Sequence, residues 1–236
     1  MLEMFFYMKP VLIAAAVIPA ILLLIYVYRS DKLEKESPGM LFSLLIYGVL
    51  STFLAQLGEQ AGDWILRALN PSYTLYCVLF FFGVVALAEE GFKYLVLKLR
   101  TWKSPEFDCQ FDGVVYAVFV SLGFALWENI GYVLSYGISA ALIRAVTAVP
   151  GHACFGVFMG VMYGLAKRYA LAGEEKKSKL YRKLAVIIPA LLHGTYDFIA
   201  TIDGEGYGWI FVVFIIAVFI WAFLLVRKTA RKDRYL

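Results

Sequence analysis

The sequence predicts an all-α membrane protein, a polytopic bundle of about seven transmembrane helices with its N-terminus outside and its C-terminus in the cytoplasm. Hydrophobic residues make up 62% of the 236 residues and charged residues only 17%, and the mean hydropathy is +0.75. Soluble domains carry about 25% charged residues, so this composition excludes a water-soluble protein. The apolar residues also form runs that reach the roughly 17 to 25 residues needed to cross a bilayer.

Seven apolar runs have this length, and they follow one another without an internal repeat or an intervening soluble domain. They cover residues 11–28, 40–57, 73–99, 113–134, 139–166, 184–200 and 208–226. The first run is preceded by one positive side chain, Lys9, and no small-residue cleavage site follows it before Arg29. These features argue against a secretory signal peptide, and we expect the run to be retained as a helix.

The distribution of the positive residues predicts the orientation of the helices. Most of the 22 Lys and Arg residues lie in four short segments, which follow the first, third, fifth and seventh runs. Because short cytoplasmic loops carry an excess of Lys and Arg, these four segments are expected in the cytoplasm. The net charge of +4 is therefore explained by membrane topology, and nucleic acid is not an expected partner.

Ionisable side chains within the apolar runs are the candidate functional residues. They are Glu89, Glu90, Lys93, Glu128, Arg144, His152, His193 and Asp197, and they include both histidines of the chain. Each ionised group near a bilayer centre costs about 2.5 to 3.5 kcal/mol on insertion scales, so such residues usually have a function. A structural contact between helices is the alternative for each of them. For Arg144 we expect a side chain that reaches the lipid headgroups.

Helical spacing predicts two groupings among these residues. Lys93 lies four residues after Glu89 and three after Glu90, so its ammonium can reach either carboxylate. One acid is then neutralised, and the other remains available as a proton acceptor. His193 and Asp197 are four residues apart, so the aspartate can orient the imidazole. Taken alone, each grouping is more typical of a buried structural contact than of a catalytic site.

The depths of these residues in their helices predict that they meet. At about 1.5 Å of rise per residue, Glu89, Glu90 and His193 lie roughly 14 to 15 Å from the cytoplasmic ends of their helices, and His152 lies roughly 20 Å from the outer end of its own. The neighbouring amide of Asn129 adds a further polar group. Together these side chains offer a base for water, a donor for an oxyanion and an acid for a leaving amine.

Four motifs in the order found here resemble the PrsW family of membrane-embedded proteases. They are AEEGFKY, FDGVVYAVFVSLGFALWENIGYV, RAVTAVPGHACFGVFMG and LLHGTYDF, which lie within residues 80–200. The loop YRSDKLEKESP is similar, more weakly, to the acidic stretch after the family's first helix. Two positions depart from the family pattern, because Ser37 separates Glu36 from Pro38 and Ala117 stands where a glycine is expected. Both departures lie outside the candidate catalytic groups.

The resemblance implies a single transmembrane protease domain over residues 1–236, in a bacterial cell membrane. The family performs site-1 cleavage of a membrane-anchored anti-sigma factor, and it is more distantly similar to the CAAX prenyl proteases and bacteriocin-processing enzymes. Motif by motif, the correspondence assigns Glu89 and Glu90 as the essential glutamates, His152 and His193 as the two histidines, and Glu128 and Asp197 as further polar positions.

Two mechanisms fit these residues. In the first, one of the paired glutamates, assisted by His193, deprotonates a water molecule, while His152 and Asn129 hold the developing oxyanion and Lys93 keeps the neighbouring glutamate ionised. In the second, a divalent metal such as zinc is held between one of the glutamates, His152 and His193, which meets the usual count of three protein ligands for catalytic zinc. The sequence has no His-Glu-x-x-His motif, and the spacing does not decide between the two.

Two other classes of function are compatible with acids and histidines inside a membrane. A proton- or ion-coupled transporter would use them as a relay, but it is expected to show inverted repeats and broken helices in matching halves, and the sequence indicates neither. A non-catalytic scaffold for another protease would use them only as contacts between helices. Cleavage of a single-span membrane substrate by the purified protein would separate a protease from both alternatives.

Overall fold

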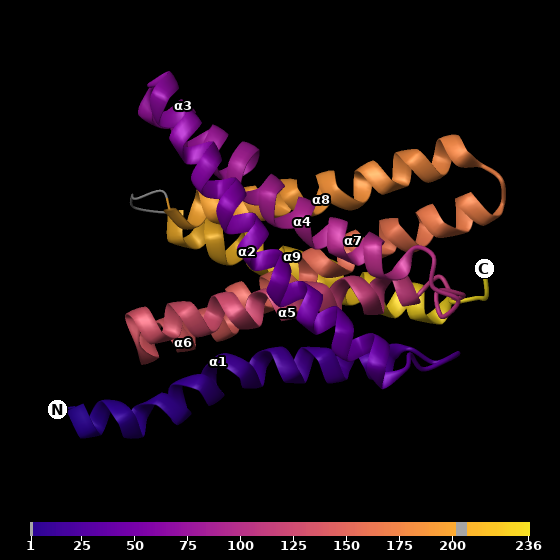
Figure 1. Cartoon of the computed structure of the whole chain (residues 1–236), viewed down its shortest axis with the longest axis horizontal. Coiled ribbons are helices and arrows are strands. Elements are labelled where there is room, and N and C mark those ends of the chain that lie inside the picture. Colours follow the sequence, from indigo (N-terminus) through magenta and orange to yellow (C-terminus); the bar gives the residue numbers. More distant parts are fainter. Residues whose placement is uncertain (1, 202–206) are drawn as a thin grey trace.

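The computed structural model describes residues 2–201 and 207–236, and these form a bundle of helices without a regular strand. The helices run roughly along the long axis of the molecule, and the two termini lie at opposite ends (Figure 1). The elements are α1 (Leu2–Ser30), α2 (Pro38–Leu69), α3 (Tyr73–Val78), the π-helical stretch η1 (Leu79–Val85), α4 (Ala86–Thr101), α5 (Asp112–Tyr136), α6 (Ile138–Val146), α7 (Ala148–Leu171), α8 (Glu175–Thr201) and α9 (Tyr207–Arg231).

Seven helical stretches of the described chain are long and apolar enough to cross a bilayer. Each of them overlaps one of the seven apolar runs, so the predicted all-α polytopic bundle is confirmed. The run 139–166 differs from a single helix, because the chain breaks at Thr147 into α6 and α7. In an unbroken helix the ring of Pro150 would clash with the carbonyl group of Val146, the last residue of α6. The break places Pro150 in the first turn of α7, where proline is tolerated.

Helices α5 and α7 form the centre of the bundle. In the most apolar stretch of α5, 78% of the residues are buried inside the bundle. Helix α7 packs closely along α5. Glycines allow this approach. A Cβ atom added to Gly160 would lie 2.4 Å from the carbonyl oxygen of Gly113, and one added to Gly156 would lie 3.0 Å from the side chain of Ser121. The two backbones therefore meet without intervening side chains, which fixes the depth of α7 relative to α5.

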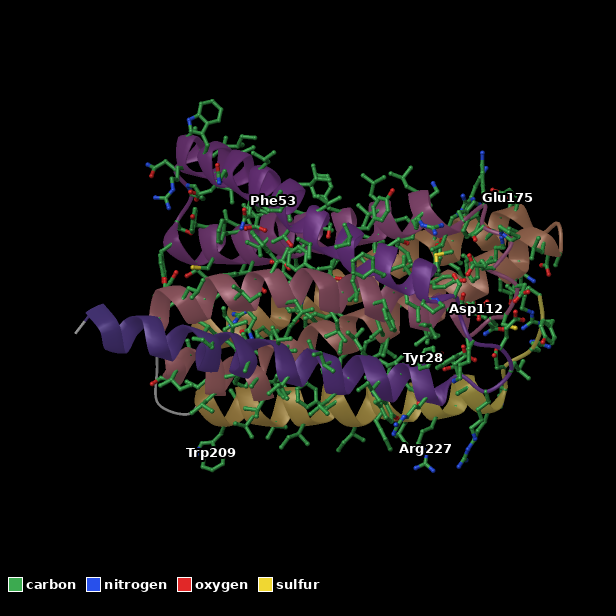
Figure 2. All side chains as sticks on the ribbon, turned by 60° about the horizontal axis from the view of Figure 1, so that its bottom comes forward. Tyr28, Phe53, Asp112, Glu175, Trp209 and Arg227 are labelled. Atoms are coloured by element: carbon green, nitrogen blue, oxygen red, sulfur yellow. The ribbon has the colours of Figure 1, made fainter. Side chains whose placement is uncertain are left out.

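The ends of the bundle differ in charge. Asp112, Glu175 and Arg227 lie toward one end and Trp209 toward the other (Figure 2). At the first of these ends, which we call the polar end, the C-terminal tail is bound to the loop before α5, because the backbone N–H of Gln110 donates to the carbonyl oxygen of Arg234 at 3.1 Å. The four basic segments of the sequence meet at the polar end (Figure 1). Its assignment to the cytoplasm stays a prediction.

Candidate active site

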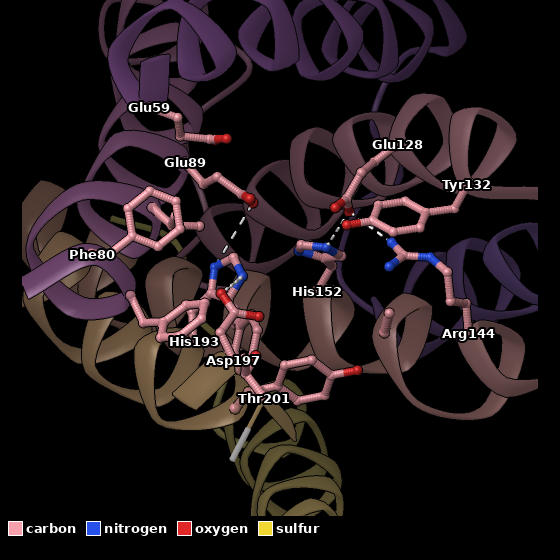
Figure 3. Close-up of a pocket in the computed structure, with 15 residues that line it drawn as sticks. Glu59, Phe80, Glu89, Glu128, Tyr132, Arg144, His152, His193, Asp197 and Thr201 are labelled. Carbon is pink, nitrogen blue, oxygen red and sulfur yellow. Dashed lines mark hydrogen bonds and ion pairs between the residues drawn. The ribbon is translucent and has the colours of Figure 1, made fainter. Parts of the chain in front are cut away.

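A cavity of about 320 Å³ lies inside the bundle, between helices that are distant in sequence. Seven ionisable side chains line it: Glu59 from α2, Glu89 from α4, Glu128 from α5, Arg144 from α6, His152 from α7, and His193 and Asp197 from α8. Figure 3 shows these side chains converging on one space. Six of the eight ionisable residues that the sequence singled out thus surround a common cavity, whereas Glu90 and Lys93 are buried outside its lining.

The two glutamates of α4 and the two histidines meet as the depth argument predicted. One potential ligand atom from each of Glu89, Glu90, His152 and His193 lies within 4.8 Å of the others, and all four residues are buried. The two carboxylates have different surroundings. Glu89 faces the cavity, whereas Glu90 is fully buried behind it, and its Oε2 atom has no hydrogen-bond partner among the described residues.

Lys93 stands at the centre of this cluster. Its Nζ atom lies 3.1 Å from Oε2 of Glu89, 2.8 Å from Oε1 of Glu90 and 3.2 Å from Nδ1 of His152. The predicted contact with both carboxylates is therefore present in the structure. The contact with His152 was not predicted, because the two residues are 59 positions apart and on different helices. The buried ammonium compensates the negative charge of the glutamate pair.

His152 is held from both of its ring nitrogens. An ammonium group can only donate, so Nδ1 accepts from Lys93 and the proton of the neutral ring lies on Nε2. Nε2 lies 2.9 Å from Oε2 of Glu128, which accepts that proton in a hydrogen bond. The same carboxylate oxygen accepts from Nη2 of Arg144 at 2.9 Å. A chain of charged contacts thus connects α6, α5 and α7 and sets the orientation of the imidazole.

His193 has carboxylates at both ring nitrogens. Nδ1 lies 3.0 Å from Oε1 of Glu90 and 3.8 Å from Oε2 of Glu89, and Nε2 lies 3.4 Å from Oδ2 of Asp197. The predicted pairing of His193 with Asp197 on one helix face is confirmed. The ring therefore stands between the glutamate pair and the aspartate.

Asn129 and Arg144 have different surroundings from those expected. Asn129 is fully buried, its Nδ2 donates to the carbonyl oxygen of Ala16, and its Oδ1 accepts from Nε of Arg144. Its amide does not line the cavity, so this geometry gives no support to an oxyanion contact. The expectation that Arg144 reaches the headgroups is wrong, because the guanidinium turns inward to Glu128 and Asn129. The break at Thr147 explains this, since α6 is a separate helix that directs Arg144 at α5.

Glu59 is a cavity residue that the sequence analysis missed. The second apolar run was expected to end at residue 57, but α2 continues to Leu69 and carries Glu59 into the cavity beside Glu89 (Figure 3). A periodic signal was present in the sequence. Small or apolar residues recur at positions 48, 52, 55, 62 and 66, and position 59 completes this alternation of three and four residues.

The cluster has the composition of a metal site. Two carboxylates and two imidazoles offer the oxygen and nitrogen donors that zinc and similar divalent ions use, and a catalytic zinc needs three of them. The unpartnered Oε2 of Glu90 is a further available donor. The residues therefore fit a divalent ion. Nζ of Lys93 already lies between three of the four donor groups, so an ion and the ammonium would compete for this position.

The π-helical stretch η1 immediately precedes α4. It comprises Leu79–Val85, and its residues Phe80, Phe81 and Val85 line the cavity. A π-helical turn shifts the register of the following helix, and such stretches occur often at functional sites. Here the stretch ends just before the α4 segment that carries Glu89 and Glu90, and it contributes an apolar wall beside them.

Comparisons with known proteins agree with the motifs. The sequence model of one protein family, described as PrsW family intramembrane metalloprotease, matches residues 36–224. A protein named Protease PrsW from Bacillus subtilis (strain 168) is 33% identical over 223 residues, which is 94% of this chain and 95% of the relative. Proteins with the same name from Oceanobacillus iheyensis and Clostridioides difficile (strain 630) are 38% identical over 188 residues and 33% identical over 219 residues.

These two further alignments cover 80% and 90% of this chain, and 82% and 87% of the relatives. No solved structure matches the chain significantly. The similarity therefore extends beyond the four motifs to nearly the whole sequence, including the helices that surround the cavity.

Proposed function

This chain belongs to the PrsW family of intramembrane metalloproteases, and from that premise we propose that it performs site-1 cleavage of a membrane-anchored anti-sigma factor. As a member of the family it is a membrane-embedded peptidase and a multi-pass membrane protein of bacteria. The proposal is supported above all by one observation. Glu89, His152 and His193 line a common cavity inside a bundle of apolar helices.

We propose Glu89 as the base that activates water. Its carboxylate faces the cavity, whereas Glu90 is buried behind it and bound to Lys93 and His193. The ammonium of Lys93 favours the ionised form of the glutamate pair, so a carboxylate is available to accept a proton. Water attacking a peptide carbonyl in the cavity would transfer its proton to Glu89.

His193 is the proposed route of that proton to the leaving amine. Its Nδ1 atom lies 3.8 Å from Oε2 of Glu89, close enough for transfer after a small rotation of either side chain. Asp197, 3.4 Å from Nε2, holds the ring and stabilises its protonated form. Asp197 is therefore a positioning residue in this scheme, and His193 delivers the proton when the C–N bond breaks.

His152 is the proposed donor to the oxyanion. Its Nε2–H donates to Glu128 at the wall of the cavity, so the donor lies beside the space that a substrate carbonyl would occupy. A divalent ion held by Glu89, Glu90, His152 and His193 would supply a Lewis acid that polarises the scissile carbonyl. Oriented donors at a developing oxyanion are worth about 2.7 to 4 kcal/mol each in other hydrolases.

Co-expression with candidate single-span anti-sigma factors tests this function. We expect the wild-type chain to release a shortened substrate, and we expect Glu89→Gln to abolish the cleavage while remaining inserted in the membrane. Glu34→Gln is the matched control, because Glu34 is exposed and lies outside the cavity. Normal cleavage by both Glu89→Gln and Glu90→Gln would refute the assignment of the glutamates.

The same reaction in detergent with purified protein separates the remaining possibilities. Cleavage by the purified chain alone would exclude a scaffold that recruits another protease. Loss of activity in chelator and recovery with zinc would assign a metal to the cluster. Cleavage of single-span proteins other than anti-sigma factors would support the peptidase activity and contradict only the proposed substrate.

A further inference from the structure

Two more cavities adjoin the catalytic cavity and share wall residues with it. One of about 620 Å³ shares Tyr132, Arg144, Tyr196 and Asp197. The other, of about 270 Å³, shares Glu128 and Tyr132. Tyr132 of α5 belongs to the walls of all three cavities. The three cavities are therefore parts of a longer depression along the half of α5 remote from the polar end.

The outer cavities extend between different helices and meet at Tyr132 and Tyr136 of α5. The larger is bounded by Ala140 and Ile143 of α6, Ala200 of α8 and Phe211 of α9. Among the described residues α6 packs against α1, α5 and α7, but it has no extensive contact with α8 or α9. The smaller lies between α2 and α5 and includes Gln56 and Ser135. Each cavity thus lies between helices at the side of the bundle.

We propose that the three cavities form one groove, which binds an extended segment of the membrane-anchored substrate across α5. The scissile bond would lie at Glu89, and the residues on either side of it would occupy the two outer cavities. This inference rests on the proposed protease function and extends it to a binding mode. It defines the partner as a polypeptide that unwinds locally and enters sideways from the bilayer.

The chemistry of the groove favours a polypeptide over a lipid tail. An extended peptide exposes N–H and C=O groups that need partners inside a membrane. Gln56, Ser135 and the tyrosines along α5 and α8 offer such partners in the walls. Arg144, Glu128 and Asp197 lie where the cavities join, and an acyl chain placed there would offer these polar groups no further hydrogen-bond partner. Aromatic and aliphatic walls in the larger cavity suit the apolar side chains of a transmembrane segment.

Two glycines allow the groove to be filled without disturbing the fold. Gly131 lines the smaller cavity and Gly208 the larger, and a Cβ atom added to either would meet no atom of the described residues within 4 Å. Gly131→Trp and Gly208→Trp would therefore place an indole in the corresponding part of the groove. The matched control is Gly39→Trp, because Gly39 is also helical, exposed and open around its Cβ position, and it lies outside the groove.

The probe is chosen from a panel of single-span reporter proteins. It is a reporter that the wild-type chain cuts and that Glu89→Gln does not cut. We expect each groove-filling variant to cut this reporter at least about tenfold more slowly, and Gly39→Trp to cut it at the wild-type rate. Wild-type rates in both groove-filling variants would overturn the groove while leaving the protease function intact.

Photo-crosslinking provides a readout that does not depend on cleavage. A benzophenone amino acid is placed at Tyr136, which lines both outer cavities, in the Glu89→Gln background. An adduct with a reporter, reduced by Gly131→Trp and Gly208→Trp but not by Gly39→Trp, is the expected result. Adducts with phospholipid alone would overturn the proposed groove. This outcome does not depend on whether any reporter is cut, so it is distinct from a failure of the proposed protease function.

Discussion

Nε2 of His152 and Nη2 of Arg144 meet at the same oxygen of Glu128, each at 2.9 Å. Arg144 also donates from Nε to Oδ1 of Asn129 at 3.0 Å, and its side chain is only 16% exposed. The guanidinium is thus fixed by two acceptors on α5 and in turn fixes the carboxylate that orients His152. Arg144, near the end of the short helix α6, therefore helps to hold His152 in its orientation.

Replacing Arg144 should reduce catalysis without removing a reacting group. We expect Arg144→Gln to lower kcat by about 10- to 100-fold with a smaller effect on KM, since partners that orient a catalytic histidine usually contribute this much. Arg144→Lys should recover part of the loss, because an ammonium can bind Glu128 but cannot reach Asn129 at the same time. Steady-state kinetics on a cleaved reporter would measure both effects.

A purely structural role for Arg144 would give a different result. In that case Arg144→Gln would lower the melting temperature and the amount of folded protein, while the folded fraction would cleave with wild-type kcat. Asn129→Asp offers a further comparison. It retains the acceptor for Arg144 but loses the donation to Ala16, so it should affect the packing of α1 more than the turnover rate.

Lys93 makes the next prediction, because its ammonium and a metal ion would compete for the same carboxylates. Lys93→Met should lower the free energy of unfolding by about 3 to 5 kcal/mol, since it leaves two buried carboxylates without their counter-charge. Zinc should then recover more stability in Lys93→Met than in the wild type. Thermal unfolding in detergent, with and without zinc, measures both quantities. Equal zinc-induced shifts in the two proteins would contradict the competition.

Much of this cluster could be predicted from helical spacing. Lys93 is three and four residues from Glu90 and Glu89, and Asp197 is four residues from His193, so one turn of helix brings each set together. Such contacts depend only on local geometry. The depth argument then placed the two histidines beside the glutamates. It applies to all the helices because they cross the same bilayer, so a residue's distance from the end of its helix indicates its depth.

The remaining contacts depend on how helices are rotated and broken, which spacing does not encode. Glu128 and His152 are 24 positions apart, and their contact requires the close packing of α5 on α7. The inward direction of Arg144 depends on the break at Thr147. Glu59 was missed for a simpler reason, since it lies two residues beyond the predicted run 40–57 and only ionisable residues within the runs were candidates. Asn129 is on the predicted helix but faces α1.

Close packing of α7 on α5 predicts a large difference between two glycines. Gly160→Ala should lower the free energy of unfolding by about 1 to 3 kcal/mol, because its Cβ would lie 2.4 Å from backbone atoms of Gly113 and Val114 that cannot move independently. Gly131→Ala should be neutral or stabilising, since its Cβ meets open space and alanine favours a helix over glycine. Thermal unfolding of both variants in detergent checks this. Equal losses would show that the two helices do not approach as closely as described.

Glu36, in the segment between α1 and α2, predicts how stability depends on pH. Its Oε2 lies 2.7 Å from the hydroxyl of Tyr116, and burial raises the pKa of Glu36 from 4.5 to about 7. The neighbouring carboxylates of Glu106 and Asp31 add to this increase in pKa, while Tyr116 and Asp112 oppose it by hydrogen bonding. The folded protein therefore favours the protonated carboxyl group at this position.

The sign of the effect follows from the direction of the shift. Below about pH 4.5 Glu36 is protonated in both the folded and the unfolded chain, and its contribution to stability is fully present. As the pH rises toward 7, the unfolded chain loses the proton first, so the stabilisation is lost through this window. Burial also raises the pKa of Asp31, to about 6, which adds a loss of the same sign. We expect the melting temperature in detergent to fall between pH 5 and pH 7.

Glu36→Gln isolates the contribution of this residue. The amide keeps an acceptor for Tyr116 but cannot ionise, so the variant should lose less stability than the wild type between pH 5 and pH 7. Glu34→Gln, at an exposed position two residues away, should retain the wild-type profile. Because the segment with Glu36 contacts the loop before α5 through Ser37 and Glu106, hydrogen exchange of that loop should follow the same pH window. A profile in Glu36→Gln as steep as that of the wild type would mean that another group controls the transition.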